Sequence, residues 1–268
     1  MLIFFGGLYK VTKLLDALFF SEKRKNLVLF LRDEAKNLTE IKDSLDVKAP
    51  AIIPQIRILE EKKIIIQKGK EYFLTDIGQI LADNYVYSLI DILDLVENNQ
   101  QFFDTHDLSM IPKTLLKQLH KLKGCRVDLV DPQNMYEPHR LFIENLSTSK
   151  QINGVTPVFN PSYPDFFLQL AMQEKEVILI LTPEVYQRTE AEYHNLIKKF
   201  HDLNNTQIYI HTGKLNVAMM VTDHYFSFTP FFKDGSYDSQ RNLIGTESSA
   251  ISWGTKFFNY LLNNSNKL

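Results

Sequence analysis

Three short segments near the start of the chain carry apolar residues at helical spacing. The first runs from about residue 22 to 31 and follows Ser21, whose hydroxyl can cap a helix. The second follows Thr39 for about two turns, and the third spans residues 48–62. The apolar positions that share a face are Leu27, Phe30 and Leu31, then Ile41 and Leu45, then Ile52, Ile56 and Leu59. Three short helices with tight links predict a helix-turn-helix core.

Two β-prone runs follow these helices. They occupy residues 64–67 and 71–74 and flank Lys68-Gly69-Lys70, where the glycine suits a hairpin turn. Thr75 can then cap a further helix. A hairpin directly after three helices is typical of a wing, so residues 1–77 are predicted to form a winged helix-turn-helix domain that binds DNA.

A longer amphipathic helix is predicted next. From Gly78 to about Asn98 the chain has no proline and no further glycine, and apolar residues recur at spacings of four and three. This helix either packs on the winged domain or forms the seam of a homodimer. We favour the dimer, because proteins that read the major groove commonly pair two half-sites by twofold symmetry. The seam residues would be Leu81, Tyr85, Leu89, Ile92 and Val96.

The polar run at residues 98–101 breaks this pattern and puts a domain boundary near residue 100, so that residues 78–100 form a connector. The next helix carries Ile111, Leu115, Leu116, Leu119 and Leu122 on one face and ends at Gly124. Strand-like runs at 126–130, 154–159, 177–181 and 207–210 then alternate with helical runs at about 134–147, 161–174 and 184–200. Such alternation predicts an α/β domain over residues 101–268 with parallel strands.

Two adjacent strands close this pattern. Residues 215–222 and 224–231 are both β-prone, and Asp223-His224 lies in the turn between them. A final helix is predicted from about residue 249 to 262. Because neighbouring strands joined by a tight turn are antiparallel, the sheet of this α/β domain is expected to be mixed.

Charge divides unevenly between the two halves. The net charge of the chain is −2, yet residues 1–80 hold 14 Lys and Arg against 11 Asp and Glu, leaving 16 against 21 for the remainder. The excess is +3 in the first part and −5 in the second. A polyanion is therefore expected to meet the winged domain.

Composition excludes several classes of protein. At 44% hydrophobic and 23% charged residues, the chain resembles an ordinary globular protein. No apolar run approaches the length that crosses a membrane, and the apolar first eight residues lack the basic region of a secretory signal. Cys125 is the only cysteine, and the histidines show no metal-binding spacing. We therefore expect a cytoplasmic protein without metal or cofactor.

The first domain resembles the archaeal winged-helix regulators. The string from Ala51 to Glu61 stands where their recognition helix lies. The resemblance implies that residues of this helix face the major groove or its flanking phosphates and that the wing tip reaches a phosphate backbone or minor groove. The residues concerned are Lys48, Ala51, Gln55 and Arg57 in the helix and Lys68 and Lys70 in the wing.

Two features qualify this DNA-binding surface. Pro54 removes a backbone donor inside the expected helix, so the helix either starts late or bends. Arg57 can pair with Glu60 or Glu61 instead of a phosphate. Sequence specificity is therefore expected to be modest or to depend on DNA shape.

The second half resembles the effector domain of the Fil-type methanogenesis-regulator family of archaeal winged-helix proteins. The strings that carry the resemblance are Thr105-His-Asp-Leu-Ser-Met-Ile-Pro112, Val177-Ile-Leu-Ile-Leu-Thr-Pro183, Asp234-Gly-Ser-Tyr-Asp238 and Trp253-Gly-Thr-Lys-Phe-Phe-Asn-Tyr260. The resemblance implies a transcription factor of methanogenic archaea whose second domain senses a signal and has a phospholipase-D-like fold. It does not supply the ligand.

Catalysis is not expected from this domain. Phospholipase-D-type chemistry uses a histidine nucleophile with a lysine two residues later, whereas His211-Thr-Gly-Lys214 puts the lysine three residues on. A serine nucleophile elbow, a glycine-rich phosphate loop and a dinucleotide fingerprint are also missing from the sequence. Two alternatives stay open: a phosphodiester-processing enzyme targeted by its winged domain, and a winged domain used for protein contacts.

A ligand pocket is expected beyond the carboxyl ends of the parallel strands, where open α/β sheets bind ligands. Asp131, Pro157–Pro161, Thr182 and His211 follow predicted strands. Tyr163, Tyr186 and Tyr237 can line such a site, although an aromatic residue in this sequence is more often part of a core. The partners predicted are therefore double-stranded DNA, a second copy of the chain and a small-molecule effector.

Overall fold

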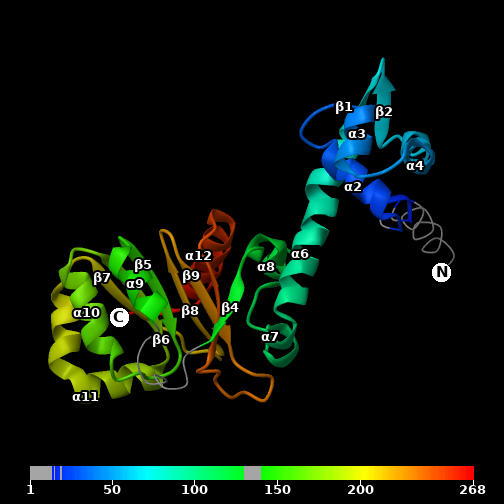
Figure 1. Ribbon diagram of the computed structural model, residues 1–268. Coiled ribbons are helices and arrows are strands. Elements are labelled where there is room, and N and C mark those ends of the chain that lie inside the picture. Colours follow the sequence, from blue (N-terminus) through cyan, green and yellow to red (C-terminus); the bar gives the residue numbers. More distant parts are fainter. Residues whose placement is uncertain (1–13, 15, 19, 130–139) are drawn as a thin grey trace. The chain divides into compact units, whose positions relative to one another are not determined.

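The computed structural model describes residues 14, 16–18, 20–129 and 140–268. The chain divides into two compact units, Met1–Ile90 and Asp91–Leu268, called unit 1 and unit 2 below (Figure 1). The division falls inside the predicted connector of residues 78–100. Each unit has its own hydrophobic core.

The described part of unit 1 has α2 (Glu22–Phe30), α3 (Leu38–Ser44) and α4 (Ala49–Glu61) before the hairpin, in the predicted order. Its strands are β1 (Lys36–Asn37), β2 (Ile65–Lys68) and β3 (Glu71–Leu74). The strands form one sheet in the order β1-β3-β2. Ser21 caps α2 as predicted, since its hydroxyl accepts from the N–H of Arg24. The prediction that Thr39 precedes α3 is wrong, because Asn37 caps α3 in a reciprocal capping box with Glu40.

The apolar stripe of α4 is confirmed. Ile52, Ile56 and Leu59 are buried in the core of unit 1. The alternative that the helix starts late is wrong: α4 begins at Ala49, and Pro50 occupies its first turn, where no backbone donor is needed. Pro54 lies inside the helix and its side chain is exposed, so the stripe stays on one face around it.

The hairpin closes against the helix that follows it. Gly69 forms the turn between β2 and β3 with a φ of 64°, in the left-handed region. Thr75 caps α5 (Asp76–Leu81) by accepting from the N–H of Gly78 at 3.0 Å. A Cβ built on Gly78 would lie only 2.0 Å from the carbonyl oxygen of Ile64. Glycine is thus required where α5 meets the start of the hairpin.

The predicted connector is helical but not uniform. A π-helical turn, η1 (Ala82–Val86), stands between α5 and α6 (Tyr87–Asn98). A π turn holds more residues than an α turn, so it rotates the later positions relative to the earlier ones. The stripe predicted from α-helical spacing therefore does not stay on one face. Leu81 packs against the core of unit 1 and Ile92 against that of unit 2, while Leu89 and Val96 are exposed. The side chain of Tyr85 lies outside the described part.

Unit 2 continues with short helices: α7 (Gln100–Thr105), α8 (Lys113–Leu116) and the 3₁₀ turn η2 (Leu119–Leu122). The prediction of one helix with five apolar residues on a face is wrong. The indole of Trp253 donates to the carbonyl oxygen of Leu115 at 3.0 Å, just before the break between α8 and η2. Tertiary contacts therefore outweigh the local helical pattern, although Leu115 and Leu122 are still buried.

The sheet of unit 2 is mixed, as predicted. Its strands are β4 (Arg126–Leu129), β5 (Gln151–Thr156), β6 (Glu176–Leu181), β7 (Thr206–Ile210), β8 (Val217–Thr222), β9 (Phe226–Pro230), β10 (Arg241–Gly245) and β11 (Asn266–Lys267). Their order is β11-β7-β6-β5-β8-β9-β10-β4. Only β5, β6 and β7 are parallel, and β4 pairs antiparallel with β10, which the sequence did not predict. The strand expected at 154–159 begins and ends earlier, because Pro157 cannot donate to a ladder.

Different helices cover the two faces of this sheet (Figure 1). On one face lie α9 (Arg140–Thr148), α10 (Tyr163–Met172) and α11 (Pro183–Asp202), and on the other lies α12 (Ser248–Asn263). Asp223-His224 forms the predicted turn between β8 and β9, where the Asp223 carboxylate accepts from the N–H of Lys150. In the described part of the chain, no helix is long and apolar enough to cross a membrane.

We expect the change Gly78→Ala to lower the free energy of unfolding of unit 1 by about 2 kcal/mol, because the hairpin must move away from the new methyl group. Gly69→Ala is a matched control: its methyl group would meet nothing within 4 Å, so the loss of about 1 kcal/mol comes from the left-handed backbone alone. Urea unfolding followed by far-ultraviolet circular dichroism measures both. Equal losses would contradict the packing role of Gly78.

Candidate functional site

The outer face of α4 carries two of the four predicted DNA-binding residues of this helix in exposed positions. Lys48 and Arg57 are exposed, and Ala51 and Gln55 are half-buried. Arg57 makes no ion pair with Glu60 or Glu61, nor with any other described residue. Its guanidinium group thus stands free on the side of α4 away from the core.

Gln55 is held by α2. Its Oε1 accepts from Nη1 of Arg24 at 2.7 Å and from the hydroxyl of Ser21 at 3.4 Å. Arg24 also donates to the backbone carbonyl oxygens of Ala17 and Asp16, which fixes its guanidinium group. Sequence reasoning missed Arg24, because its partner on α4 lies 31 residues away and no local pattern connects them.

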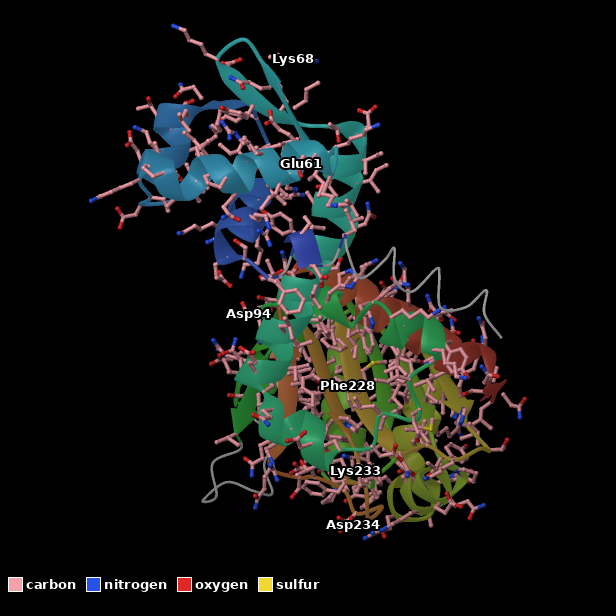
Figure 2. All side chains as sticks on the ribbon, turned by 90° about the vertical axis from the view of Figure 1, so that its right-hand side faces the viewer. Glu61, Lys68, Asp94, Phe228, Lys233 and Asp234 are labelled. Carbon is pink, nitrogen blue, oxygen red and sulfur yellow. The ribbon has the colours of Figure 1, made fainter. Side chains whose placement is uncertain are left out.

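The hairpin tip carries the other two predicted residues. Lys68 and Lys70 are exposed on either side of Gly69, and Figure 2 shows Lys68 at the end of the hairpin. The Nζ of Lys68 lies 5.5 Å from the ring centroid of Phe73, a cation–π distance that leaves the ammonium group hydrated. The tip thus presents two cations to solvent.

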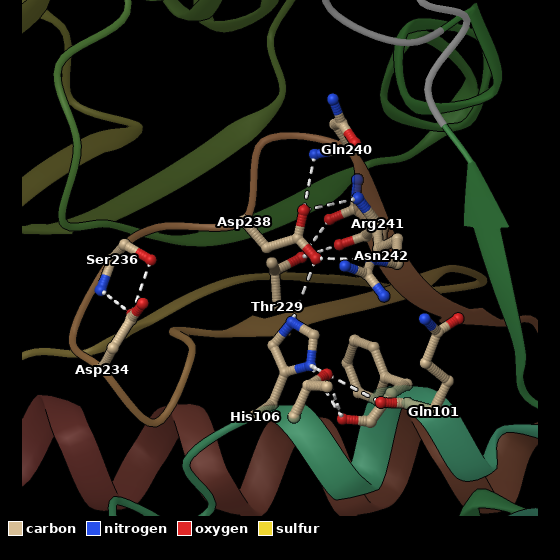
Figure 3. A network of polar contacts seen from close by, with 11 residues as sticks. Gln101, His106, Thr229, Asp234, Ser236, Asp238, Gln240, Arg241 and Asn242 are labelled. Atoms are coloured by element: carbon tan, nitrogen blue, oxygen red, sulfur yellow. Dashed lines mark hydrogen bonds and ion pairs between the residues drawn. The ribbon is translucent and has the colours of Figure 1, made fainter.

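A buried polar network joins α7 to the loop after β9 (Figure 3). The ring of His106 is 1% exposed, and its Nε2 lies 3.1 Å from Oδ2 of Asp238 while its Nδ1 lies 2.7 Å from the carbonyl oxygen of Phe102. Asp238 also accepts from Nε of Arg241 at 2.9 Å. Both ring nitrogens of His106 thus lie within hydrogen-bonding distance of an oxygen atom of unit 2.

The backbone strengthens this connection. The N–H of Asp107 donates to the carbonyl oxygen of Phe231, and the N–H of Lys233 donates to that of Thr105. His106 is the C-cap residue of α7, and its side-chain partners among the described residues belong to unit 2.

A cavity lies between α10, α11 and the parallel strands. It contains about 490 Å³ of empty space, part of which is open to solvent. Its wall includes Tyr163, as predicted for a ligand site, and residues 158–160 of the predicted segment Pro157–Pro161. Thr182, His211, Tyr186 and Tyr237 do not line it. Asp131 lies outside the described residues.

The other predicted ligand residues have structural partners. Thr182 caps α11 by accepting from the N–H of Val185, and Nδ1 of His211 lies 3.0 Å from the hydroxyl of Ser265. Burial lowers the pKa of His211. Burial also raises the pKa of Tyr163, Tyr186 and Tyr237, the last to about 12, so these phenols are neutral near pH 7.

Groups suited to nucleophilic catalysis are not arranged for it. Burial raises the pKa of the Cys125 thiol to about 12, with a contribution from Glu247, so it stays protonated near neutral pH. Lys214 is exposed and lies 4.0 Å from Asp107, and His211 is held by Ser265. Among the residues the structure describes, no cluster of three His, Cys, Asp or Glu side chains could hold a metal ion.

The polar network should be a large contributor to the stability of unit 2. We expect Asp238→Ala to lower its free energy of unfolding by about 3 kcal/mol, since the change removes the acceptor of the buried His106 ring and of the half-buried Arg241 guanidinium group. Trp253, the single tryptophan, lies in the core of unit 2 and reports its unfolding by fluorescence. Asp234→Ala in the same loop is the control, because its exposed carboxylate binds only Ser236. A transition unchanged by Asp238→Ala would show that the network is dispensable.

Two solved structures are similar at low scores. TrmBL2, an archaeal chromatin protein whose structure is described as showing a novel mode of DNA binding, aligns with a TM-score of 0.43 and 14% identity over 96% of this chain and 98% of its own. Nuc, a phospholipase D family member from Salmonella typhimurium, aligns with a TM-score of 0.39 and 10% identity over 54% of this chain and 98% of its own. Likenesses this distant carry no argument about function.

Sequence comparison is more informative. The methanogenesis regulatory protein FilR1 of Methanothrix harundinacea (strain 6Ac) is 25% identical over 256 residues, which are 92% of this chain and 56% of that relative. The chain thus spans little more than half the length of this relative. Residues 12–94 match the model of the FilR1 N-terminal domain, and residues 135–264 match that of the FilR1 middle domain. The chain belongs to the FilR1 family of methanogenesis regulatory proteins.

Proposed function

We propose that this protein is a transcriptional regulator whose unit 1 is a winged helix-turn-helix that binds double-stranded DNA. The observation that carries the proposal is the position of Arg57. Burial of Ile52, Ile56 and Leu59 turns the unpaired guanidinium group of Arg57 to the outside of α4, in the helix that follows α2 and α3 and precedes the hairpin. The family, named for regulatory proteins, is consistent with this role.

Affinity would come mainly from phosphate contacts. The cations available on the proposed surface are Lys48, Arg57, Lys68 and Lys70, all exposed. Direct reading of bases would be limited, because Gln55 is held by Arg24 and Pro54 lies on the exposed face of α4. We therefore propose modest sequence specificity, with a contribution from DNA shape.

The triple variant Arg57→Ala, Lys68→Ala, Lys70→Ala tests DNA binding. In gel-shift titrations with a duplex from upstream of its own gene, we expect at least about a tenfold loss of affinity. The slope of log K against log salt should fall by about two to three, because each lost phosphate contact releases fewer counterions.

A variant with the same change of charge serves as control. Lys198→Ala, Lys199→Ala, Lys256→Ala removes three exposed lysines of unit 2 and should leave binding near the wild-type value. If the first variant binds as tightly as the wild type, or if wild-type binding does not depend on salt, the DNA-binding proposal fails. A protein partner for unit 1 would then be the better hypothesis.

We also propose a homodimer formed through α6. The structure narrows the predicted seam, because Leu81 and Ile92 are engaged in the cores of the units. Leu89, Leu93 and Val96 are exposed on α6 at spacings of four and three, which is the pattern of a helical stripe. Their exposed fractions are 38%, 49% and 36%. Pairing with a second copy would bury them.

Leu93→Glu is expected to shift the protein from dimer to monomer in sedimentation equilibrium, since a carboxylate cannot be buried in an apolar seam without a partner. Leu129→Glu is the control: Leu129 is 67% exposed, lies on β4 and is outside the proposed seam. A wild-type monomer at all concentrations tested, or a dimer unaffected by Leu93→Glu, would rule out this interface.

Unit 2 would be the sensory part of the regulator. The cavity beneath α10 and α11 supports this role, because it lies beside the ends of parallel strands where α/β sheets commonly bind small molecules.

A further inference from the structure

We infer that the cavity of unit 2 binds a small, uncharged, largely apolar molecule that carries one hydroxyl or carbonyl group. The inference rests on the sensory role proposed for unit 2 and gives that role a ligand class. Three observations lead to it: the described wall has no charged side chain, the hydroxyl of Thr156 in it forms no hydrogen bond with a described residue, and the helix over it is broken at Tyr193.

The wall excludes charged ligands. Among the described residues that line it, none is Asp, Glu, Lys, Arg or His. Its floor is built from Leu179 and Leu181 of β6 and Ile208 of β7, and its cover from Phe167 of α10 and Phe200 of α11. A charged group placed there would lose its hydration without gaining a counterion, which costs several kcal/mol.

Thr156 supplies the polar contact. It is the last residue of β5, is 7% exposed and lines the cavity, and its hydroxyl forms no hydrogen bond with any described residue. This hydroxyl is therefore available to a ligand atom as donor or acceptor. Thr189, the other buried threonine of the wall, is already satisfied by the carbonyl oxygen of Val185 at 2.7 Å.

Helix α11, which covers the cavity, is irregular where it passes over it. Tyr193 interrupts α11 with φ −130° and ψ 35°, and no proline or glycine explains the break. Thr189 before it and Leu196 after it both line the cavity. The ring of Tyr193 packs near Phe159, with centroids 6.2 Å apart, at the segment that follows β5. Residues on both sides of the break thus line one cavity.

The size and the wall limit the ligand. The 490 Å³ of empty space includes the open mouth, so it is an upper bound on the space that a ligand can fill. A nucleotide or an amino acid does not match the uncharged wall, whereas a small molecule with one polar atom does.

The test uses toluene, phenol and benzoate as probes and the full chain without DNA. Methyl-detected NMR titration measures the dissociation constants, and Leu, Val and Ile methyl groups of the wall should shift. We expect phenol and toluene to bind the wild type and benzoate not to bind. Thr156→Val should raise the dissociation constant of phenol about three- to tenfold and leave that of toluene unchanged. The reason is that one hydrogen bond is lost while the shape of the side chain is kept.

Leu196→Phe should abolish binding of both neutral probes by filling the cavity, while Leu129→Phe, the same substitution at an exposed position of β4, should have no effect. The fluorescence of Trp253 checks that each variant is folded. If Leu196→Phe does not fold, the effect of Thr156→Val on phenol and toluene binding tests the inference by itself. The inference is overturned if neither neutral probe binds the wild type, if benzoate binds as well as phenol, or if Thr156→Val leaves phenol unchanged.

These outcomes separate the inference from the proposed function. Binding of phenol by the wild type together with failed gel shifts would retain the ligand site and remove the DNA-binding role. Normal gel shifts with no binding of either neutral probe would remove the ligand site alone.

Discussion

The structure of unit 2 depends on covering both faces of one sheet. Strand β6 shows the constraint: Ile178 and Ile180 point into the core shared with α12, and Val177, Leu179 and Leu181 into the core beneath α10 and α11. Because β6 is apolar on both sides, helices must cover both faces of the sheet there. The two polar features of unit 2 lie where a covering helix ends or is irregular. The cavity lies at the break of α11, and the His106 network lies at the end of α7.

In unit 1, too, burial of apolar residues determines which side chains face outward. One core joins α2, α3, α4 and the hairpin, and the position of Arg57 is a consequence of the residues on the opposite face of α4. The contact between Gly78 and the carbonyl oxygen of Ile64 then fixes the hairpin against α5. Packing in the core of unit 1 thus sets the orientation of the outer face of α4 and of the hairpin tip. The exposed cations Arg57, Lys68 and Lys70 are not part of that core. The proposed DNA-binding surface carries few charges. A rigid core beneath it would reduce the entropy that is lost on binding, so fewer contacts would be needed for a given affinity.

The features that were predicted correctly from the sequence depend on interactions between residues close together in the chain. Ser21 and Thr75 cap the helices that follow them, Gly69 turns the hairpin, and the run at residues 177–181 forms β6. The features that were missed depend on distant partners. His106 and Asp238 are separated by 132 residues, and the break after α8 is accompanied by a bond from Trp253. The π turn of η1 rotates the positions after it relative to those before it, so the predicted apolar stripe does not stay on one face. Residue spacing alone contains no signal for such a turn.

The position of the cavity in unit 2 can be compared with the general rule for ligand sites in α/β sheets. Pockets of α/β sheets lie beyond the carboxyl ends of the parallel strands, and this rule selected the segment after β5 together with Thr182 after β6 and His211 after β7. Of these three places, only the segment after β5 lines the cavity. Thr182 is used to cap α11, and His211 is held by Ser265 from the end of α12, so their polar atoms serve the fold. Thr156 has no such partner among the described residues. The rule therefore selects the edge of the sheet at which the cavity lies, and the hydrogen-bond partners of each strand end determine which polar groups remain free for the proposed ligand.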